Sequence, residues 1–463
     1  MNAETKYSKI SKNKVCDILH SNYILLGEDL TAADRLLLKP LEIGRDVGEE
    51  KKVPWEAEPK DRFYFVGVVL FILGTVNTLP GSFLANANEY WMYKLRNTSL
   101  DHDDPNNRPF LQKNFATFQS FAIILPMIVM YFIAAFVGHK IRPKTKALIF
   151  LCPIILIFFV HTLLVNVNTD GVQLAFFFFT SITLVVLSVV TGIGAVGCLT
   201  LASSFPSNYT KCFLVGQGLA GIFTSVIRII SIASAPSTVD AAFIYFVTGT
   251  VTMAIGTVLF VMASKTPFFR YHLRDIDAET KRKVNSIGAI LRAVQQFWKV
   301  LLLNVIGIIF PIASIVNLVV SEYKGTGNTW GDWYFVTVAT FLIPAICEIT
   351  GKLLATLIDK DYPWWFLYIG ILIKSLLLGP MIFFSNAQPR SHTPVVFKHD
   401  WQYIIIMILN SLWGAYLGNV LMLKLIRLIP KDKLDLLISV DLLFAGLVAI
   451  ATAPLGLIIV AML

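Results

Sequence analysis

Charged side chains inside two long apolar stretches are the residues of this sequence whose chemistry most needs explaining. One stretch reads GQGLAGIFTSVIRIIS and contains Arg228, and another reads FLIPAICEITGKLLATL and contains Glu348 and Lys352. A charged residue at the centre of a bilayer costs about 2.5–3.5 kcal/mol on insertion scales, so these residues are candidates for function. Glu348 and Lys352 are four apart, so they project from one helix face in the favourable acidic-before-basic order.

Arg228 belongs to a polar stripe. Spacings of 4, 3, 4 and 3 place five residues on one helix face: Gln217, Gly221, Thr224, Arg228 and Ser231. We expect this stripe to face a bundle interior, with Glu348 as partner of Arg228. Arg228 then locks two helices, lines a water-filled path, or does both. With Lys352 the cluster carries about one net positive charge, which leaves room for a polar substrate. The alternative is a purely structural set of ion pairs.

The composition identifies the class of protein. Of 463 residues, 56% are hydrophobic and 15% are charged, and the mean hydropathy is +0.67. About 20 apolar residues cross a bilayer core. Eleven stretches qualify, near residues 63–88, 115–138, 147–167, 172–203, 212–234, 241–264, 298–320, 333–358, 364–384, 401–423 and 434–462. The sequence therefore predicts an all-α polytopic membrane protein with eleven transmembrane helices, embedded in the lipid bilayer.

The distribution of basic residues predicts the orientation. With the N-terminus inside, inner loops hold 18 Lys and Arg residues and outer loops hold 7, so we expect a cytoplasmic N-terminus and an extracellular C-terminus. The net charge of +9 then reflects basic cytoplasmic loops, and no nucleic-acid partner is expected. Asn97 begins an N-glycosylation sequon in the first outer loop. We expect the plasma membrane, with an endolysosomal membrane as the alternative.

Four regions follow from these spans. Residues 1–60 form a cytoplasmic tail, 61–264 a six-helix half, 265–297 a cytoplasmic loop and 298–463 a five-helix half. The segment IGAILRAVQQF in the loop has the periodicity of a surface helix. The sequence does not indicate an oligomeric state.

The polar residues give no support to an enzyme. No span carries a nucleophile–base pair, an HExxH motif, a Walker A loop or GxGxxG, and the five cysteines have no metal-site spacing. We therefore expect no catalytic residue, no metal and no cofactor.

Two further spans carry local signals. In the first span, Pro80-Gly81 is expected to interrupt the helix where it lines a cavity. Asn77, Gly81 and Asn88 share one face there. In the fourth span, TGIGAVG predicts close helix packing through small residues.

Several motifs, in order from about residue 59 to 435, resemble the equilibrative nucleoside transporter family. They are P.DRF from Pro59, LGT...LP up to Pro80, FP..YT from Phe205, GQGLAG...S..RI from Gly216, FFRYHL from Phe268, F.HD from Phe397, G.YL from Gly414 and PK at Pro430. The resemblance implies a relative of the major facilitator fold, with six- and five-helix halves around a central cavity. It also implies facilitative, alternating-access transport of nucleosides and some nucleobases.

The resemblance assigns roles to the charged pair. Where the family has Asp, Gly and Arg, this chain has Glu348, Gly351 and Lys352, and in the family that pair meets the sugar hydroxyls. Lys lacks the planar donor fork of Arg. The other substrate-binding candidates are Phe341 for the apolar face of the base, with Phe83 and Phe223 as further candidates for that face, and Gly81, Ser82 and Gln217. Arg228 is expected in gating or charge balance with Glu348.

The chain departs from the family at two positions expected to contact the base. A Trp–Asn pair of the family is Gly81-Ser82 here, and a base-reading Gln is Ala195. Base recognition must then come from other residues, or the preferred substrate is unusual. The alternatives are a carrier of another solute such as an organic cation, proton-coupled nucleoside transport through Glu348, and a non-transporting receptor or scaffold with loop 265–299 as its partner site.

Overall fold

The computed structural model describes residues 59–96, 109–235, 237–279, 287–308, 313–316, 318–388, 393–428 and 433–461. Residues from Glu58 to Leu463 form one compact unit. Apart from two isolated β-bridges, the regular structure in these ranges is helical, which confirms the all-α class.

The N-terminal half begins with the short η1 (Arg62–Tyr64) and ends before residue 264. Its helices are α3 (Phe65–Asn86), α4 (Asn88–Lys94), α5 (Phe110–Val137), η3 (Gly138–Lys140), α6 (Pro143–Val165), α7 (Gln173–Ser203), α8 (Ser207–Ser234) and α9 (Thr238–Ala263). Helix α10 (Pro267–Glu279) follows in the connecting segment.

The C-terminal half has more broken helices. They are α11 (Ile287–Ile308), α12 (Ala313–Val316), η4 (Trp330–Tyr334), η5 (Val336–Leu342), α13 (Ile343–Ile358), α14 (Trp364–Ile373), η6 (Lys374–Leu378), α15 (Gly379–Phe383), α16 (Asp400–Leu428) and α17 (Leu434–Ala461). The segments η4, η5 and η6 are π-helical, a geometry that occurs often at functional sites.

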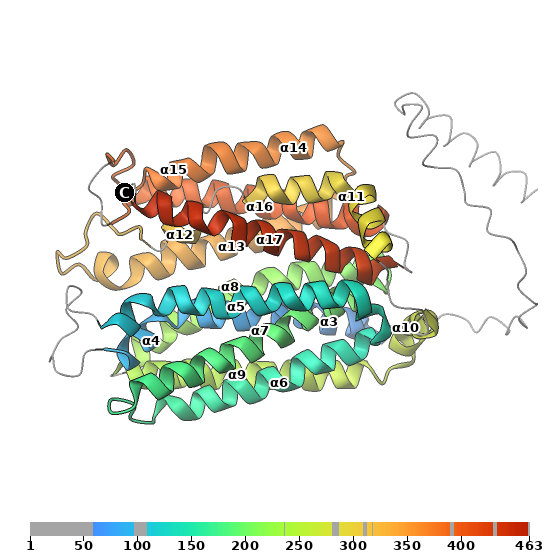
Figure 1. The fold of residues 1–463 in the computed structure, drawn as a ribbon, viewed down its shortest axis with the longest axis horizontal. Coiled ribbons are helices and arrows are strands. Elements are labelled where there is room, and N and C mark those ends of the chain that lie inside the picture. Colours follow the sequence, from blue (N-terminus) through green and yellow to red (C-terminus); the bar gives the residue numbers. More distant parts are fainter. Residues whose placement is uncertain are drawn as a thin grey trace, which may run out of the picture. The chain divides into compact units, whose positions relative to one another are not determined.

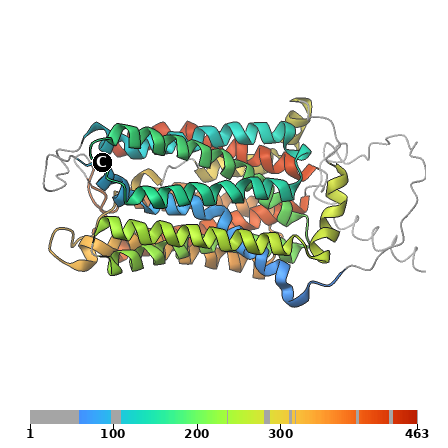
Figure 2. The same ribbon diagram turned by 90° about the horizontal axis from the view of Figure 1, so that it is seen from below.

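The helices of each half lie together (Figure 1), and the view from below shows them running nearly parallel (Figure 2). The halves meet chiefly where α8 packs on α13 and where α5 packs on α17. Helix α8 also packs against α3 along much of its length. It therefore lies between its own half and the other one.

The described residues contain ten helices long and apolar enough to cross a membrane, or eleven if a bent pair counts as one span. That pair, Ile287–Gln295 and Phe297–Gly307, differs in direction by 73°, and Phe297 has non-helical dihedral angles. The second member of the pair begins where the sequence predicted a span near 298–320, and residues 309–312 and 317 of that span lie outside the described residues. Helix α11 begins earlier, in the segment whose periodicity predicted a surface helix, and bends before its apolar part.

The predicted break of the first span at Pro80-Gly81 is wrong, because α3 runs unbroken from Phe65 to Asn86 with Pro80 inside it. A proline removes one amide donor, and membrane helices tolerate that loss where neighbouring helices pack around them. Here the hydroxyl groups of Thr75 and Thr78 donate to the carbonyl oxygens of Gly216 and Gln217 on α8, at 2.9 and 3.0 Å.

Small residues allow the closest helix contacts. A Cβ atom at Gly216 would lie 2.0 Å from the carbonyl oxygen of Phe71, and one at Gly74 would lie 2.1 Å from that of Phe213. The glycines of TGIGAVG in α7 behave as predicted: a Cβ at Gly194 would lie 2.4 Å from the ring of Phe150. Backbone-to-backbone approach of this kind is the usual basis of membrane helix association.

Gly216→Ala should therefore destabilise the protein, since its new methyl group meets backbone rather than a flexible side chain. Overpacking of this type costs about 1–3 kcal/mol, so we expect a lower thermal unfolding temperature in detergent. Gly418→Ala is the matched control, because Gly418 is also helical and has no neighbour within 4 Å of a new Cβ. Equal unfolding temperatures for the two variants would contradict this packing.

Candidate functional site: three cavities along α8

Three cavities lie between the halves, and α8 lines each of them. We name them after one residue each: the Lys352 cavity, of about 250 Å³, the Glu348 cavity, of about 420 Å³, and the Arg228 cavity, of about 490 Å³.

The cavities follow one another along the helices. From first to last, α8 contributes Gln217, then Gly221, then Arg228 and Ser231. The facing elements contribute residues in the reverse order, from Lys352 through Glu348 to Tyr334 of η4 and the preceding Thr329. The cavities therefore form a row, and the prediction that the polar stripe of α8 faces the bundle interior is confirmed.

The Glu348 cavity combines polar and apolar walls. Of the predicted substrate-binding residues, Ser82, Phe341 and Glu348 line this cavity together. Gln217 and Lys352 line the neighbouring Lys352 cavity instead. Gly81 lines none of the three cavities. A Cβ atom added at Gly81 would have no neighbour within 4 Å.

Glu348 and Lys352 form the ion pair that their spacing predicts, with 2.7 Å between Lys352 Nζ and Glu348 Oε1. The Lys352 side chain is 16% exposed and that of Glu348 is 45% exposed, so the carboxylate is the more accessible partner. Asn419 Nδ2 donates to the backbone oxygen of Lys352 at 3.0 Å. The two members of this pair line neighbouring cavities, and the carboxylate remains available to hydroxyl donors.

The backbones of α8 and α13 come closest between these two cavities. A Cβ at Gly218 would lie 3.0 Å from Ile349 Cα, and one at Gly221 would lie 2.9 Å from Ala345 Cβ. Glycine thus permits a narrow contact between the halves at this level. The contact separates the Lys352 cavity from the Glu348 cavity.

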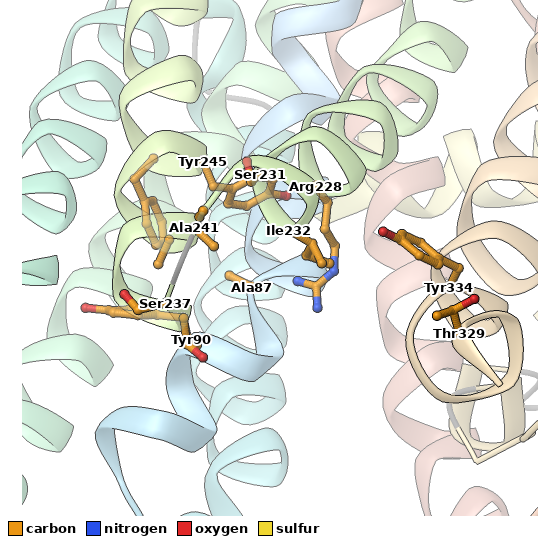
Figure 3. Close-up of a pocket in the computed structure, with 14 residues that line it drawn as sticks. Ala87, Tyr90, Arg228, Ser231, Ile232, Ser237, Ala241, Tyr245, Thr329 and Tyr334 are labelled. Atoms are coloured by element: carbon orange, nitrogen blue, oxygen red, sulfur yellow. The ribbon is translucent and has the colours of Figure 1, made fainter. Parts of the chain in front are cut away.

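Arg228 lines its own cavity with Tyr245, Ser231 and Tyr334. Figure 3 shows Arg228 on one side of this cavity and Tyr334 and Thr329 on the other. Because Gly221 contacts Ala345, the helical rise of 1.5 Å per residue puts Arg228 about 15 Å along the axis from the level of Glu348. The expected pairing of Arg228 with Glu348 therefore spans two cavities, and the partner that the structure gives Glu348 is Lys352.

Two groups of ion pairs join the halves at the end where α7 passes into α8. Lys211 Nζ lies 2.6 Å from Asp359 Oδ2, and Asp359 also pairs with Arg427. In the second group Lys146 pairs with Asp435. We call this end the Lys211 end.

The aromatic candidates divide between cavity and core. Phe341 lines the Glu348 cavity. Phe83, by contrast, is fully buried and its ring lies 4.5 Å from that of Tyr245, and Phe223 packs against the same core. Both are therefore core residues, since their helix faces turn toward their own half. Ala195 also packs against this core.

The sequence analysis missed several residues of the Glu348 cavity, and Lys374 and Asn410 are the two that matter most here. Each lies inside a predicted span, so the signal that selected Arg228, a polar group in an apolar stretch, was available for both. Asn97 lies outside the described residues, and the described residues include no cluster of three or more His, Cys, Asp or Glu suited to a metal ion.

The fold is that of a known class of membrane transporters. The proton:xylose symporter XylE of the major facilitator superfamily superposes with a TM-score of 0.58 over 85% of this chain and 88% of its own, at 11% identity. The fucose:proton symporter FucP of E. coli gives 0.51 over 86% and 92%, at 13% identity. These likenesses show a major-facilitator-like fold.

The sequence comparisons identify the family within that class. The family model described as nucleoside transporter matches residues 181–287 and 274–435, more than half of the chain, so the chain belongs to the nucleoside transporter family. Equilibrative nucleoside transporter 3 of Rattus norvegicus is 25% identical over 89% of this chain and 91% of its own. Equilibrative nucleoside transporter 1 of Homo sapiens is 25% identical over 79% and 90%. The chain is therefore a transporter rather than an enzyme.

The Asp359 ion pairs generate a prediction about pH. Burial favours the neutral acid, but hydrogen bonds from Lys211 and Arg427 outweigh it and hold the pKa of the Asp359 carboxyl below its ordinary value. The pKa of this carboxyl in the unfolded chain is about 4. Because its pKa in the folded protein is lower, the ion pairs stabilise the protein fully above the unfolded-state pKa. This stabilisation is lost as the pH falls through the folded-state pKa.

Asp359→Asn should thus destabilise the protein by about 1 kcal/mol at pH 7, with a difference that shrinks below about pH 4. Asn tolerates the left-handed backbone at this position, where φ is 44°. Asp361→Asn is the control, because Asp361 pairs with Lys424 but its side chain is 72% exposed. Thermal unfolding of wild type and variant at pH 7 and at low pH measures the stability difference. A difference that grows at low pH would contradict the role given to the Asp359 ion pairs.

Proposed function

We propose that this protein moves nucleosides across a membrane by facilitative alternating access, with the substrate bound in the Glu348 cavity. The observation that carries the proposal is a mid-span cavity between the halves that combines an accessible carboxylate with an aromatic side chain. Its volume of about 420 Å³ falls in the range of about 300–1,000 Å³ usual for small-molecule sites. Membership of the nucleoside transporter family supports the same function.

The two kinds of wall suit the two parts of a nucleoside. Adjacent sugar hydroxyls are donors, and the Glu348 carboxylate accepts two hydrogen bonds with its two oxygens. Lys352 holds that carboxylate in place through their ion pair. Phe341 offers an apolar face to the base, and Ser82 adds a hydroxyl group. We also keep Gly81 and Gln217 as candidates, because Gly81 precedes Ser82 and Gln217 lines the next cavity beside Lys352.

The arrangement suits alternating access. Ion pairs join the halves at the Lys211 end, and the Arg228 cavity lies beyond the Glu348 cavity in the other direction. We expect substrate to enter through the Arg228 cavity and to leave through the Lys352 cavity after the ion pairs at the Lys211 end separate. Arg228 then acts in gating and charge balance. If the N-terminus is cytoplasmic, the Lys211 end faces the cytoplasm, and we propose the plasma membrane as the location.

A neutral solute fits this site better than an organic cation. The charge of Glu348 is already balanced by Lys352, so an organic cation would have to compete with the Lys352 ammonium group for the carboxylate. Neutral substrates also need no driving force against the membrane potential. These points support a facilitative carrier of neutral solutes.

The proposal predicts uptake of radiolabelled inosine and uridine into cells that lack nucleoside transport. Glu348→Gln should lower kcat/KM by about 10- to 100-fold, because hydrogen bonds to a charged group contribute about 1.5–3 kcal/mol. Glu322→Gln is the matched control, since Glu322 pairs with His399 outside the three cavities. Absence of uptake by the wild type would overturn the function, and full uptake by Glu348→Gln would overturn the site.

A further inference from the structure

A lysine occupies the middle of a membrane span at the Glu348 cavity. Lys374 lies ten residues after Trp364 in the 20-residue candidate span Trp364–Phe383, and it lines the cavity at the start of the π-helical η6. An ammonium group at this depth carries a cost of about 2.5–3.5 kcal/mol on insertion scales. Such a cost is usual where the charge serves a function.

No carboxylate of the described residues forms an ion pair with this ammonium. Among the residues that the structure describes, Lys374 has neither an ion pair nor a hydrogen bond, whereas Lys352, Lys211, Lys146 and Lys424 each pair with a carboxylate. Its side chain lies against Gly414, where a Cβ would be 2.8 Å from Lys374 Cε and 3.5 Å from Nζ. Gly414 therefore leaves room for the lysine beside the cavity.

A second polar atom of the same cavity is also unsatisfied. Asn410 is only 8% exposed, and within the described part of the chain its Oδ1 atom is buried without a hydrogen-bond donor. Asn410 and Gly414 lie one turn apart on α16, so Lys374 and Asn410 border the same side of the cavity. Lys374 is a half-buried donor and Asn410 Oδ1 a buried acceptor, and a ligand that pairs with both would complete them.

We propose that Lys374 and Asn410 form the base-recognition subsite of this transporter, and that it selects bases with a ring carbonyl beside a ring N–H group. Hypoxanthine, guanine and uracil carry this edge. The ammonium of Lys374 donates to the carbonyl oxygen, and Asn410 Oδ1 accepts from the N–H. The inference rests on the proposed function and adds the substrate preference.

The chemistry of the two groups sets the direction of the preference. An ammonium has three donors and no acceptor, and lysine pairs with the oxygen and ring nitrogen of guanine for this reason. Adenine and cytosine carry an amino group where the other bases carry the carbonyl, so they would place donor against donor.

Glu348 and Lys374 belong to different elements around one cavity. Helix α13 and η6 both pack against α16, and Phe341 of η5 lines the same space. A nucleoside with its sugar at Glu348 therefore extends its base toward Lys374 and Asn410. The two subsites together hold both ends of one substrate.

The test compares substrates that differ only in this edge: inosine with adenosine, and uridine with cytidine. We expect the wild type to favour inosine over adenosine by about tenfold in kcat/KM, as for a charge-assisted hydrogen bond. In Lys374→Met and in Asn410→Leu this ratio should fall toward one. The ratio is measured within each variant, so differences in expression cancel. Lys360→Met, at an exposed lysine outside the three cavities, should keep the wild-type ratio.

Ligand-induced thermal stabilisation of purified protein is a second readout, which does not depend on delivery to the cell membrane. Inosine should raise the unfolding temperature of purified wild-type protein more than adenosine does. A wild-type ratio near one, or an unchanged ratio in both variants, would overturn the inference while nucleoside uptake leaves the function intact. Lys374-dependent uptake of nucleoside 5′-monophosphates in preference to nucleosides would assign Lys374 to phosphate and also overturn it. If the wild type transports no nucleoside, the proposed function fails and the inference fails with it.

Discussion

The close approach of α8 and α13 at Gly218 and Gly221 is the contact on which the rest of the site depends. Two helices from different halves meet there almost backbone to backbone, and their polar side chains are brought to the same interface. A bilayer supplies no water to polar groups at that depth. The charged residues can therefore exist only where cavities or partners receive them, and the interface between the halves provides both.

The same contact explains why one transporter fold can hold a substrate and still move. The glycine contact is small and apolar. At the Lys211 end the ion pairs of Asp359 are partly exposed, whereas the Lys146–Asp435 pair is largely buried. Exposed ion pairs contribute little to stability, so they can break at low cost when the halves rotate. The Glu348–Lys352 pair lies within one helix and stays intact during such a movement. The proposed substrate-binding residues and the residues of the closing contacts are thus different.

The sequence predicted the spans, the stripe on α8 and the Glu348–Lys352 pair, because each depends on local spacing in a helix. It did not predict the bend at Phe297 or the continuity of α3 through Pro80, since both depend on neighbouring helices. Phe83 was expected at the site but is buried, because periodicity cannot tell which half a helix face contacts. Lys374 and Asn410 carried a readable signal, yet only the packing of η6 and α16 shows that they share a cavity with Glu348.

Cysteine labelling along the row of cavities tests the account most directly. Single cysteines at Ile232, Ser411 and Gln217, one for each cavity, would be placed in a chain without native cysteines and exposed to an impermeant thiol reagent from outside the cell. The account predicts labelling at Ile232 and Ser411, slower labelling of Ser411 with inosine present, and no labelling of Gln217 beyond the α8–α13 contact. Equal labelling of Gln217 and Ile232 without substrate, or no protection of Ser411 by inosine, would contradict it.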